Sequence, residues 1–294
     1  MNITVCVRQT PDSSSVYIDP ISGQVDYERF VQVLNAADAC AVEAAVRLKE
    51  QLGAKVTVIT FGPQDAAGAL RAALAIGADS ALRLWNAQGE TWGPFTVASA
   101  LAVYLQSDTL PAPDLILCGD AASDWSSGIV GPALAEQLHL PQVTGAIHIE
   151  AQPREGNAAM NLRVTRKLER GYREILEAQP PLLISVTSDL NEPRYPSLPA
   201  HLASLAASIP VIDPLSLDIT LGQDATDAIT IIEMHTPRPL PRRISAPDSH
   251  HSAFERIGEI VAGGATGRQT KLVEGSPAEL AQALVEFLRA KGFI

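Results

Sequence analysis

Short apolar runs alternate with helix-forming segments through the first half of the chain. The apolar runs are residues 3–7 (ITVCV), 55–61 (KVTVITF), 81–85 and 114–118. The helix-forming segments are residues 37–52, 64–76, 96–106 and 130–138. Strands that alternate with helices predict a parallel sheet with helices on both faces, because each parallel connection needs a long crossover. We therefore expect an α/β fold with a mostly parallel sheet.

The second half of the chain has a different pattern. Residues 160–168 and 172–176 are predicted to pair as two strands. The apolar run at 181–187 (PLLISVT) is predicted to form a buried strand. The segment 191–199 (NEPRYPSLP) contains too much proline for a helix or a central strand. These residues therefore predict further strands and one stiff loop.

The last quarter of the chain is predicted to form an extended arm and a helix. Prolines are frequent from residue 210 to 250, and periodicity is weak there except at 228–234. The sequence SPAELAQALVEFLRAKG places Ser276 three residues before Glu279, which is the spacing of a helix capping box. We expect the arm to lie against another surface and the capped segment to form the terminal helix.

Composition excludes several classes of function. With 46% apolar and 19% charged residues, the chain has the composition of a folded globular protein. Its 22 basic and 33 acidic residues give a net charge of −11, which argues against nucleic acid or an anionic membrane as the main partner. No apolar run reaches the ~18 residues of a membrane span. The three cysteines are widely spaced, and the first residues do not have the pattern of a signal peptide. We expect a cytoplasmic protein without disulfides.

Three strand ends are predicted to form a ligand site. In parallel sheets, ligands bind outside the carboxyl ends of the strands; here these ends are followed by residues 7–8, 61–63 and 119–131. The longest segment lies in CGDAASDWSSGIVGPALAEQL (118–138) and joins a strand to a helix start through small residues. Such loops bring backbone N–H groups to a phosphate. The candidate donors are Ser126, Ser127 and the N–H groups of residues 128–131.

The same loop lacks features that phosphate sites commonly have. It contains no lysine, matches neither the Walker A nor the GxGxxG pattern, and carries Asp120 and Asp124, which would repel an anion. Its composition leaves a phosphate cradle and an ordinary strand-to-helix turn equally open. Asp124 fits the first alternative if it accepts hydrogen bonds from a ribose hydroxyl or from N–H groups of the loop.

No catalytic constellation is predicted from the sequence. The six histidines are scattered, and none lies in an HxxxH or HExxH pattern. GxSxG is missing, and GGATG at 263–267 lacks the spacing of a dinucleotide fingerprint. We therefore expect no catalytic residues and no metal ligands, so that any redox chemistry would come from a bound cofactor.

Seven segments resemble, in order, the β subunits of electron transfer flavoproteins. They are VCVRQTPD (5–12), LNAADACAVEAAVRLKE (34–50), VTVITFGP (56–63), RAALAIGADSALRL (71–84), DLILCGDAASDWSSGIVGPALAEQLHLPQVT (114–144), VTRKLERGYREI (164–175) and NEPRYPSLP (191–199). The resemblance covers nearly the whole chain. It implies a Rossmann-like, doubly wound subunit of an αβ heterodimer, whose α subunit carries an FAD that shuttles electrons between a dehydrogenase and an acceptor.

The resemblance also implies that this subunit binds an adenine nucleotide. The implied contacts are Cys6, Asn35, Ala36, Ala37, Asp38 and Phe61, together with Gly119, Asp120, Ala121, Ala122, Ser123, Asp124, Ser127, Gly128, Ile129, Val130 and Gly131 from the long loop. These are largely the same strand ends that the α/β pattern selects.

The resemblance to NEPRYPSLP implies a recognition loop at residues 189–200. Its Tyr195 and Leu198 would dock a flavin dehydrogenase. We accordingly assign residues 1–210 to an α/β nucleotide-binding domain that includes this loop. Residues 211–294 are assigned to an extended arm and a C-terminal helix that pack on the α subunit.

Members of the family differ in the nucleotide that they bind. It is AMP in the simple carriers and a second FAD in the bifurcating group. AMP-type members commonly have Asn-Gln-Thr-Gly where residues 128–131 read GIVG, so Val130 removes a hydroxyl donor. Lys167 also stands where AMP-type members have an acidic residue, whereas Asp120 differs from the arginine of several bifurcating relatives. We favour FAD, which would allow bifurcation from NADH, and retain AMP as the alternative.

Two other classes of function are weighed against this one. A stand-alone adenine-nucleotide-binding protein, of the universal-stress or ATP-pyrophosphatase type, would have more basic or glycine contacts to ATP and no arm. A free-standing dehydrogenase would have a GxGxxG motif and a proton relay. Residues 210–294 speak against the first class, and the motifs of the second are missing.

Overall fold

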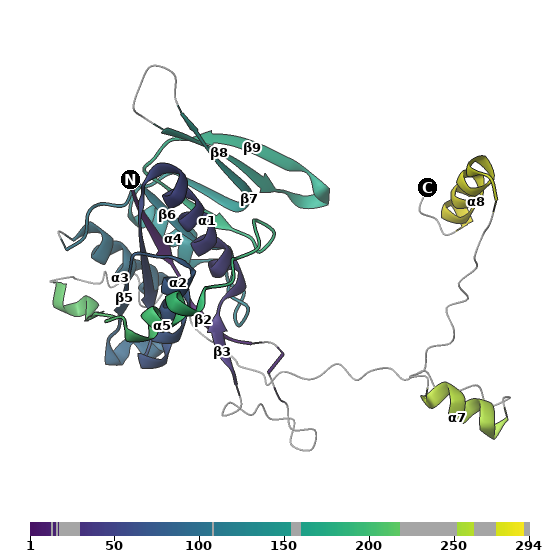
Figure 1. Cartoon of the computed structure of the whole chain (residues 1–294), viewed down its shortest axis with the longest axis horizontal. Helices are drawn as coiled ribbons and strands as arrows, with labels where there is room; N and C mark the ends of the chain where they lie inside the picture. Colours follow the sequence, from purple (N-terminus) through teal and green to yellow (C-terminus); the bar gives the residue numbers. More distant parts are fainter. Residues whose placement is uncertain are drawn as a thin grey trace. The chain divides into compact units, whose positions relative to one another are not determined.

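The chain divides into two compact units in the computed structural model shown in Figure 1. They comprise Met1–Pro237 and Arg238–Ile294. The structure describes residues 1–12, 14–15, 17, 30–107, 109–153, 160–217, 252–261 and 275–290.

The first unit is built on a nine-stranded sheet. Its strands are β1 (Asn2–Cys6), β4 (Lys55–Phe61), β5 (Ser80–Leu84), β6 (Leu115–Gly119), β7 (Gln142–Pro153), β8 (Met160–Lys167), β9 (Arg173–Ala178), β10 (Leu182–Val186) and β11 (Val211–Ile212). Their order is β11-β5-β4-β1-β6-β10-β7-β8-β9. All neighbours from β11 to β7 are parallel, whereas β8 runs antiparallel to both of its neighbours, β7 and β9. The predicted α/β fold with a mostly parallel sheet is confirmed.

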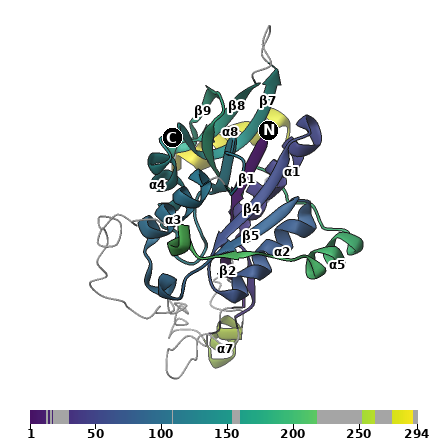
Figure 2. The same ribbon diagram turned by 90° about the vertical axis from the view of Figure 1, so that its left-hand side faces the viewer.

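Helices cover both faces of this sheet, as Figure 2 shows. They are α1 (Ala36–Leu52), α2 (Ala67–Ile76), α3 (Pro94–Gln106) and α4 (Val130–Gln137), while α5 (Leu198–Ala206) packs on α2. The strands alternate between two apolar clusters: Leu117 packs with residues of α1 and α2, and its neighbour Ile116 packs with residues of α3 and α4. This two-sided burial explains the continuous apolar runs of the parallel strands.

The strand order reverses at β1. The chain leaves β1, adds β4 and β5 on one side, and then returns to place β6 on the other side. Cys6 and Cys118 are register partners at the carboxyl ends of β1 and β6. Such a reversal opens a crevice between strand ends, which is where open α/β sheets bind their ligands.

Several short or irregular strands were not predicted. The twelve-residue β7 is interrupted by polar residues and by Gly145, whose positive φ of 70° suits glycine. Neither the two-stranded ribbon of β2 (Gln9–Pro11) with β3 (Gln32–Leu34) nor the short edge strand β11, which pairs with β5, was predicted. Conversely, the predicted pair of strands at 160–176 is confirmed as β8 and β9.

The second unit contributes the helices α7 (Ala253–Val261) and α8 (Pro277–Ala290). The backbone N–H of Ser276 donates to the Glu279 carboxylate at 2.8 Å, so the predicted start of the terminal helix is confirmed. The predicted periodic segment at 228–234 lies outside the described residues. Packing of the arm on another subunit stays a prediction.

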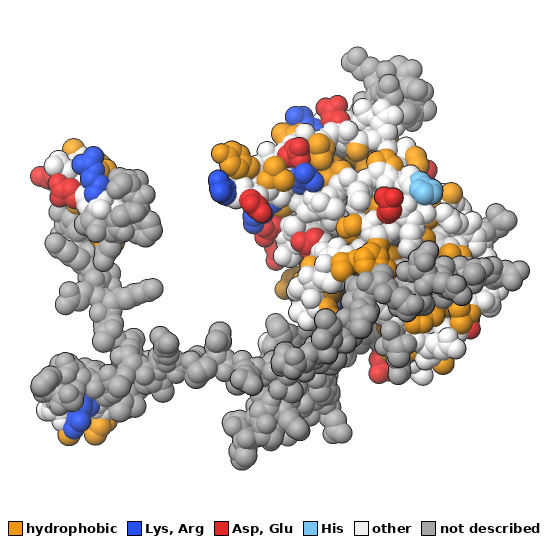
Figure 3. Space-filling view, turned by 180° about the vertical axis from the view of Figure 1, so that it is seen from behind, with side chains coloured by type: hydrophobic (Ala, Val, Ile, Leu, Met, Phe, Trp, Pro, Cys, Tyr) orange, Lys and Arg blue, Asp and Glu red, His pale blue; other side chains and the backbone are white. Residues whose placement is uncertain are grey.

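Two observations concern the surface charges and the possibility of a membrane-spanning helix. On the face seen in Figure 3, the described acidic and basic side chains lie intermixed, with apolar side chains between them. Within the described ranges, no helix combines the length and the apolar character needed to cross a bilayer.

Removing core volume from β6 tests the importance of the central strands. Leu117 is fully buried, so Leu117→Ala should lower the free energy of unfolding by about 3–5 kcal/mol in urea denaturation. Ile175 on β9 is exposed, and Ile175→Ala should change that free energy by less than about 0.5 kcal/mol. Equal losses for the two variants would contradict the assigned core.

Candidate functional site

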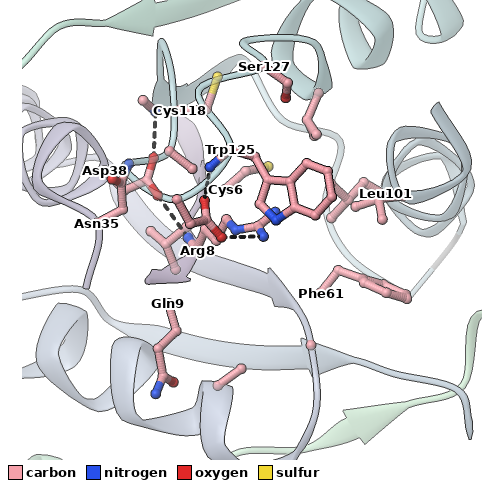
Figure 4. Close-up of a pocket in the computed structure, with 18 of the residues that line it drawn as sticks. Cys6, Arg8, Gln9, Asn35, Asp38, Phe61, Leu101, Cys118, Trp125 and Ser127 are labelled. Carbon is pink, nitrogen blue, oxygen red and sulfur yellow. Dashed lines mark hydrogen bonds and ion pairs between the residues drawn. The ribbon is translucent and has the colours of Figure 1, made fainter. Parts of the chain in front are cut away.

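A cavity of about 600 Å³ opens at the reversal point of the sheet (Figure 4). It is lined by residues that follow β1, β4, β5 and β6 and by the start of α4. Its volume lies within the ~300–1,000 Å³ typical of sites for small molecules and cofactors. The strand ends that the sequence selects therefore converge on one cavity.

Asp38, in the first turn of α1, joins the two central strand ends. Its buried carboxylate accepts hydrogen bonds from the backbone N–H groups of Arg8, at 2.8 Å, and of Gly119, at 2.7 Å. Burial raises the pKa of Asp38 to about 6, although these hydrogen bonds oppose the rise. One carboxylate thus holds the exits of β1 and β6 together beside the cavity.

Asn35, just before α1, fixes the beginning of the long loop. Its side-chain amide donates to the carbonyl oxygen of Ala121 at 3.0 Å, and its Oδ1 accepts from the N–H of Ser123 at 3.2 Å. Asn35 itself is buried. The loop is therefore shaped by α1 before any ligand binds.

Close approach explains why the loop contains glycine at both ends. A Cβ atom on Gly119 would lie 2.9 Å from the Cβ of Ala37, and one on Gly131 would lie 2.8 Å from Sγ of Cys118. Any other residue would push α1 or α4 away from the strand ends. The residue before α4 is Ile129, whose side chain cannot cap the helix, so the first N–H groups of α4 are offered to the cavity.

Asp124, one of the two acidic residues of the loop, is hydrogen-bonded by donors of the protein. Arg8 binds Asp124 through Nη2 and Oδ2 at 2.6 Å, and the other oxygen of Asp124 accepts from the N–H of Trp125 at 2.8 Å. Asp124 therefore accepts from a loop N–H group, which was one of its two predicted roles. The arrangement reduces the repulsion that the carboxylate would exert on a bound anion.

Aromatic side chains form another wall of the cavity. Phe61 stacks on Trp92, with ring centroids 5.1 Å apart, and meets Trp85 at a tilt with centroids 5.5 Å apart. Trp125 lies on the loop at the rim and is 66% exposed. Flat apolar walls of this kind suit the faces of aromatic ring systems.

The two cysteines at the base of the cavity are unsuited to nucleophilic chemistry. Burial raises the pKa of Cys6 to about 12 and also raises that of Cys118, so both stay protonated at neutral pH. In the described part of the chain, no group of three or more His, Cys, Asp and Glu side chains is arranged to hold a metal ion. What the described lining does provide is aromatic walls and the N–H groups at the start of α4.

Comparison with known proteins identifies the family. Residues 25–216 match the electron transfer flavoprotein domain. The electron transfer flavoprotein subunit beta of Thermoanaerobacterium thermosaccharolyticum is 40% identical over 198 residues, which are 67% of this chain and 72% of that protein. The chain belongs to the electron transfer flavoprotein β-subunit family.

Two other relatives extend this likeness. The caffeyl-CoA reductase-Etf complex subunit CarD of Acetobacterium woodii is 37% identical over 202 residues, covering 67% of this chain and 72% of CarD. The electron transfer flavoprotein subunit beta of Bacillus subtilis is 29% identical over 293 residues, covering 99% and 98% of the two chains. Similarity to the β-subunit family therefore continues through the last quarter of the chain.

Most residues implied by the β-subunit resemblance line the cavity. They are Cys6, Asn35, Asp38, Phe61, Gly119, Asp120, Ala121, Ala122, Asp124, Ser127, Gly128, Ile129, Val130 and Gly131. Ala36, Ala37 and Ser123 do not line it, nor does the candidate donor Ser126. Ala37 packs behind Gly119, and the N–H of Ser123 is bound by Asn35. Nucleotide contact by any of these residues stays a prediction.

Several lining residues were missed in the predicted set for this β subunit. Trp85 and Trp92 follow β5, so the strand-end rule would have selected them if it had been applied to this strand as well. Arg8 lay in a selected strand end but was not assigned a role. Its pairing with Asp124 joins residues 116 positions apart, which no local pattern reveals.

Titration of Asp38 should make the free energy of unfolding depend on pH. Because the pKa of about 6 in the folded chain lies above the ordinary 3.8, the folded state binds the proton more tightly than the unfolded state. This contribution to the free energy of unfolding is full at low pH and is lost as pH rises through about 6.

The Asp38→Asn variant lacks this titration and serves as the reference in urea unfolding. Between pH 8 and pH 5, the free energy of unfolding of the natural chain should rise relative to that of Asp38→Asn by about 1.4 kcal/mol. If the free energies of unfolding of the two proteins changed in parallel with pH, the raised pKa of the buried Asp38 would be contradicted.

Proposed function

We propose that the chain is the β subunit of a heterodimeric electron transfer flavoprotein and binds an adenine nucleotide between the ends of β1 and β6. The main observation that supports this proposal is the cavity at the reversal of strand order. It is lined by most of the residues that the family resemblance implies. The names of relatives support an electron-transfer role, including the acryloyl-CoA reductase electron transfer subunit gamma of Anaerotignum propionicum.

The residues present fit a nucleotide. The phosphates would lie at the start of α4, where Ser127 and the N–H groups of residues 128–131 are donors and no side chain caps the helix. The ring system would lie against the aromatic wall of Phe61, Trp85 and Trp92. The negative charge of Asp124 is already offset by Arg8.

FAD is favoured over AMP as the bound nucleotide. Val130 supplies no hydroxyl donor at the cavity, and three aromatic side chains, Phe61, Trp85 and Trp92, line it. When bound, a flavin accepts and donates electrons reversibly. The chain binds and orients it and shields it from water, while the protonated thiols of Cys6 and Cys118 take no proton from it. A second flavin in the heterodimer would make bifurcation from NADH available.

Exposed apolar residues support the predicted partners. Tyr195 is 93% exposed and Leu198 is 70% exposed, which fits docking of a flavin dehydrogenase. On α8, the exposed Leu280, Leu284 and Phe287 repeat at helical spacing, which fits packing of this helix on an FAD-carrying α subunit.

Cofactor content tests the proposed nucleotide. The heterodimer, purified after co-expression with its α subunit, should release two flavins per αβ pair on denaturation. Absorbance spectra and chromatography of the released material measure them. One flavin with one AMP would assign the simple-carrier alternative, whereas a chain that binds ATP with no flavoprotein partner would contradict the proposed function.

Truncation of the exposed leucine tests the proposed docking loop. Leu198→Ala should raise the dehydrogenase concentration that half-saturates electron transfer by about tenfold, because apolar anchors contribute strongly to docking. Cofactor content should stay unchanged. Leu52→Ala removes an equally large exposed side chain from the end of α1 and serves as the control. An unchanged half-saturating concentration in Leu198→Ala would contradict the docking role of Leu198.

A further inference from the structure

The segment that precedes the exposed docking residues is bound along one face of α1. Cys40, Glu43, Arg47 and Glu50 follow each other at helical spacing on α1. Each of them hydrogen-bonds a residue between positions 188 and 194. We call residues 188–194 the clamped segment.

A buried carboxylate forms the centre of this contact. Glu43 is only 2% exposed, and its oxygens accept from Nε of Arg194 at 2.8 Å and from Nε of Arg47 at 2.6 Å. The backbone N–H of Arg194 donates to the same carboxylate at 3.2 Å. Burial alone would raise the pKa of Glu43, but the hydrogen bonds from the two arginines outweigh it and lower the pKa below its ordinary value. The carboxylate is therefore charged at neutral pH.

Arg194 extends the contact along the helix. Its Nη1 binds Oε1 of Glu50 at 2.5 Å, and its Nη2 binds Oε2 of Glu50 at 3.1 Å. One guanidinium thus spans two carboxylates that lie two turns apart on α1. Planar, multidentate contacts of this kind fix orientation as well as distance.

The clamped segment is also held at its middle residue, Asn191. The thiol of Cys40 donates to the carbonyl oxygen of Asn191 at 3.3 Å, and the side-chain amide of Asn191 donates to the carbonyl oxygen of Cys40 at 2.9 Å. Cys40 is buried beneath the segment. Its thiol can therefore meet a reagent only if the segment lifts from α1.

The residues that follow the clamped segment are exposed. The chain after them is attached again, at the end of α5. Tyr195 comes directly after Arg194, and Leu198 begins α5. The last turn of α5 is bound by Arg71 of α2, whose Nη1 donates to the carbonyl oxygen of Leu205 at 2.7 Å. The two exposed apolar side chains thus stand between two points of attachment.

We propose that Glu43 and Arg194 are positioning residues that form the docking surface before a partner arrives. The same helix α1 binds Gly119 through Asp38 in its first turn and the clamped segment through Glu43 and Glu50 further along. It therefore sets the docking surface at a fixed position relative to the cavity. The docking role in this proposal rests on the proposed function, but the clamp itself can be tested without a partner.

Selective alkylation of Cys40 measures opening of the clamp. The full chain is treated with N-ethylmaleimide, and peptide mass spectrometry follows Cys6, Cys40 and Cys118, which are the only cysteines. Arg194→Gln removes the charge-assisted hydrogen bonds, so the labelling rate of Cys40 should rise at least about tenfold. The rates of the two cavity cysteines should stay unchanged. Arg194→Lys keeps the charge without the planar fork and should give an intermediate rate.

The control is Arg166→Gln, which removes another arginine–glutamate pair, with Glu174 on β9. It should leave Cys40 protected. An unchanged labelling rate of Cys40 in Arg194→Gln would overturn the proposal. Equal acceleration at all three cysteines would also overturn it, because the contact would then serve global folding and no local clamp.

Electron transfer in the heterodimer provides the second readout. Arg194→Gln should raise the dehydrogenase concentration for half-saturation at least about fivefold and leave the maximal rate and the cofactor content unchanged. A lower maximal rate with unchanged half-saturation would overturn the positioning role. If Leu198→Ala has no effect on transfer, the docking function fails, whereas labelling of Cys40 still decides whether the clamp exists.

Discussion

The carboxylate of Asp38 is the interaction on which the site depends. It accepts the N–H group of Arg8, just after β1, and that of Gly119, the last residue of β6, beyond the point where β1 and β6 stop pairing with each other. Because a buried charge is costly, this position is stable only while both donors are in place. The geometry of the two strand ends, and with it the cavity, follows from this single group.

Helix α1 carries this constraint to other parts of the molecule. Its alanine-rich side, including Ala41 and Ala45, packs on the sheet. Its Asp38 binds Gly119 at the start of the long loop, and its Glu43 binds the clamped segment further along. Small side chains allow the helix to lie close to the strands, and Gly119 allows its first turn to reach them. One rigid element thereby positions both the cavity and the exposed residues Tyr195 and Leu198.

Local patterns were sufficient to predict most of the parallel strands and most of the cavity. Two-sided burial makes these strands continuous apolar runs, and ligand sites follow strand ends, so the loop of residues 119–131 could be found from sequence. β7 could not, because polar positions and Gly145 interrupt its pattern. Pairs such as Glu43 with Arg194 lie 151 positions apart, and no local rule relates them. The tryptophans after β5 were predictable in principle but needed the strand-end rule at every strand.

A crystal structure of the αβ heterodimer with its retained nucleotide would test the proposed site most directly. Density for the phosphates should lie at the start of α4 beside Ser127 and Gly131, and density for a ring system should lie against Phe61 and Trp92. A nucleotide bound elsewhere in the chain, with only water in the cavity between β1 and β6, would contradict the proposed site.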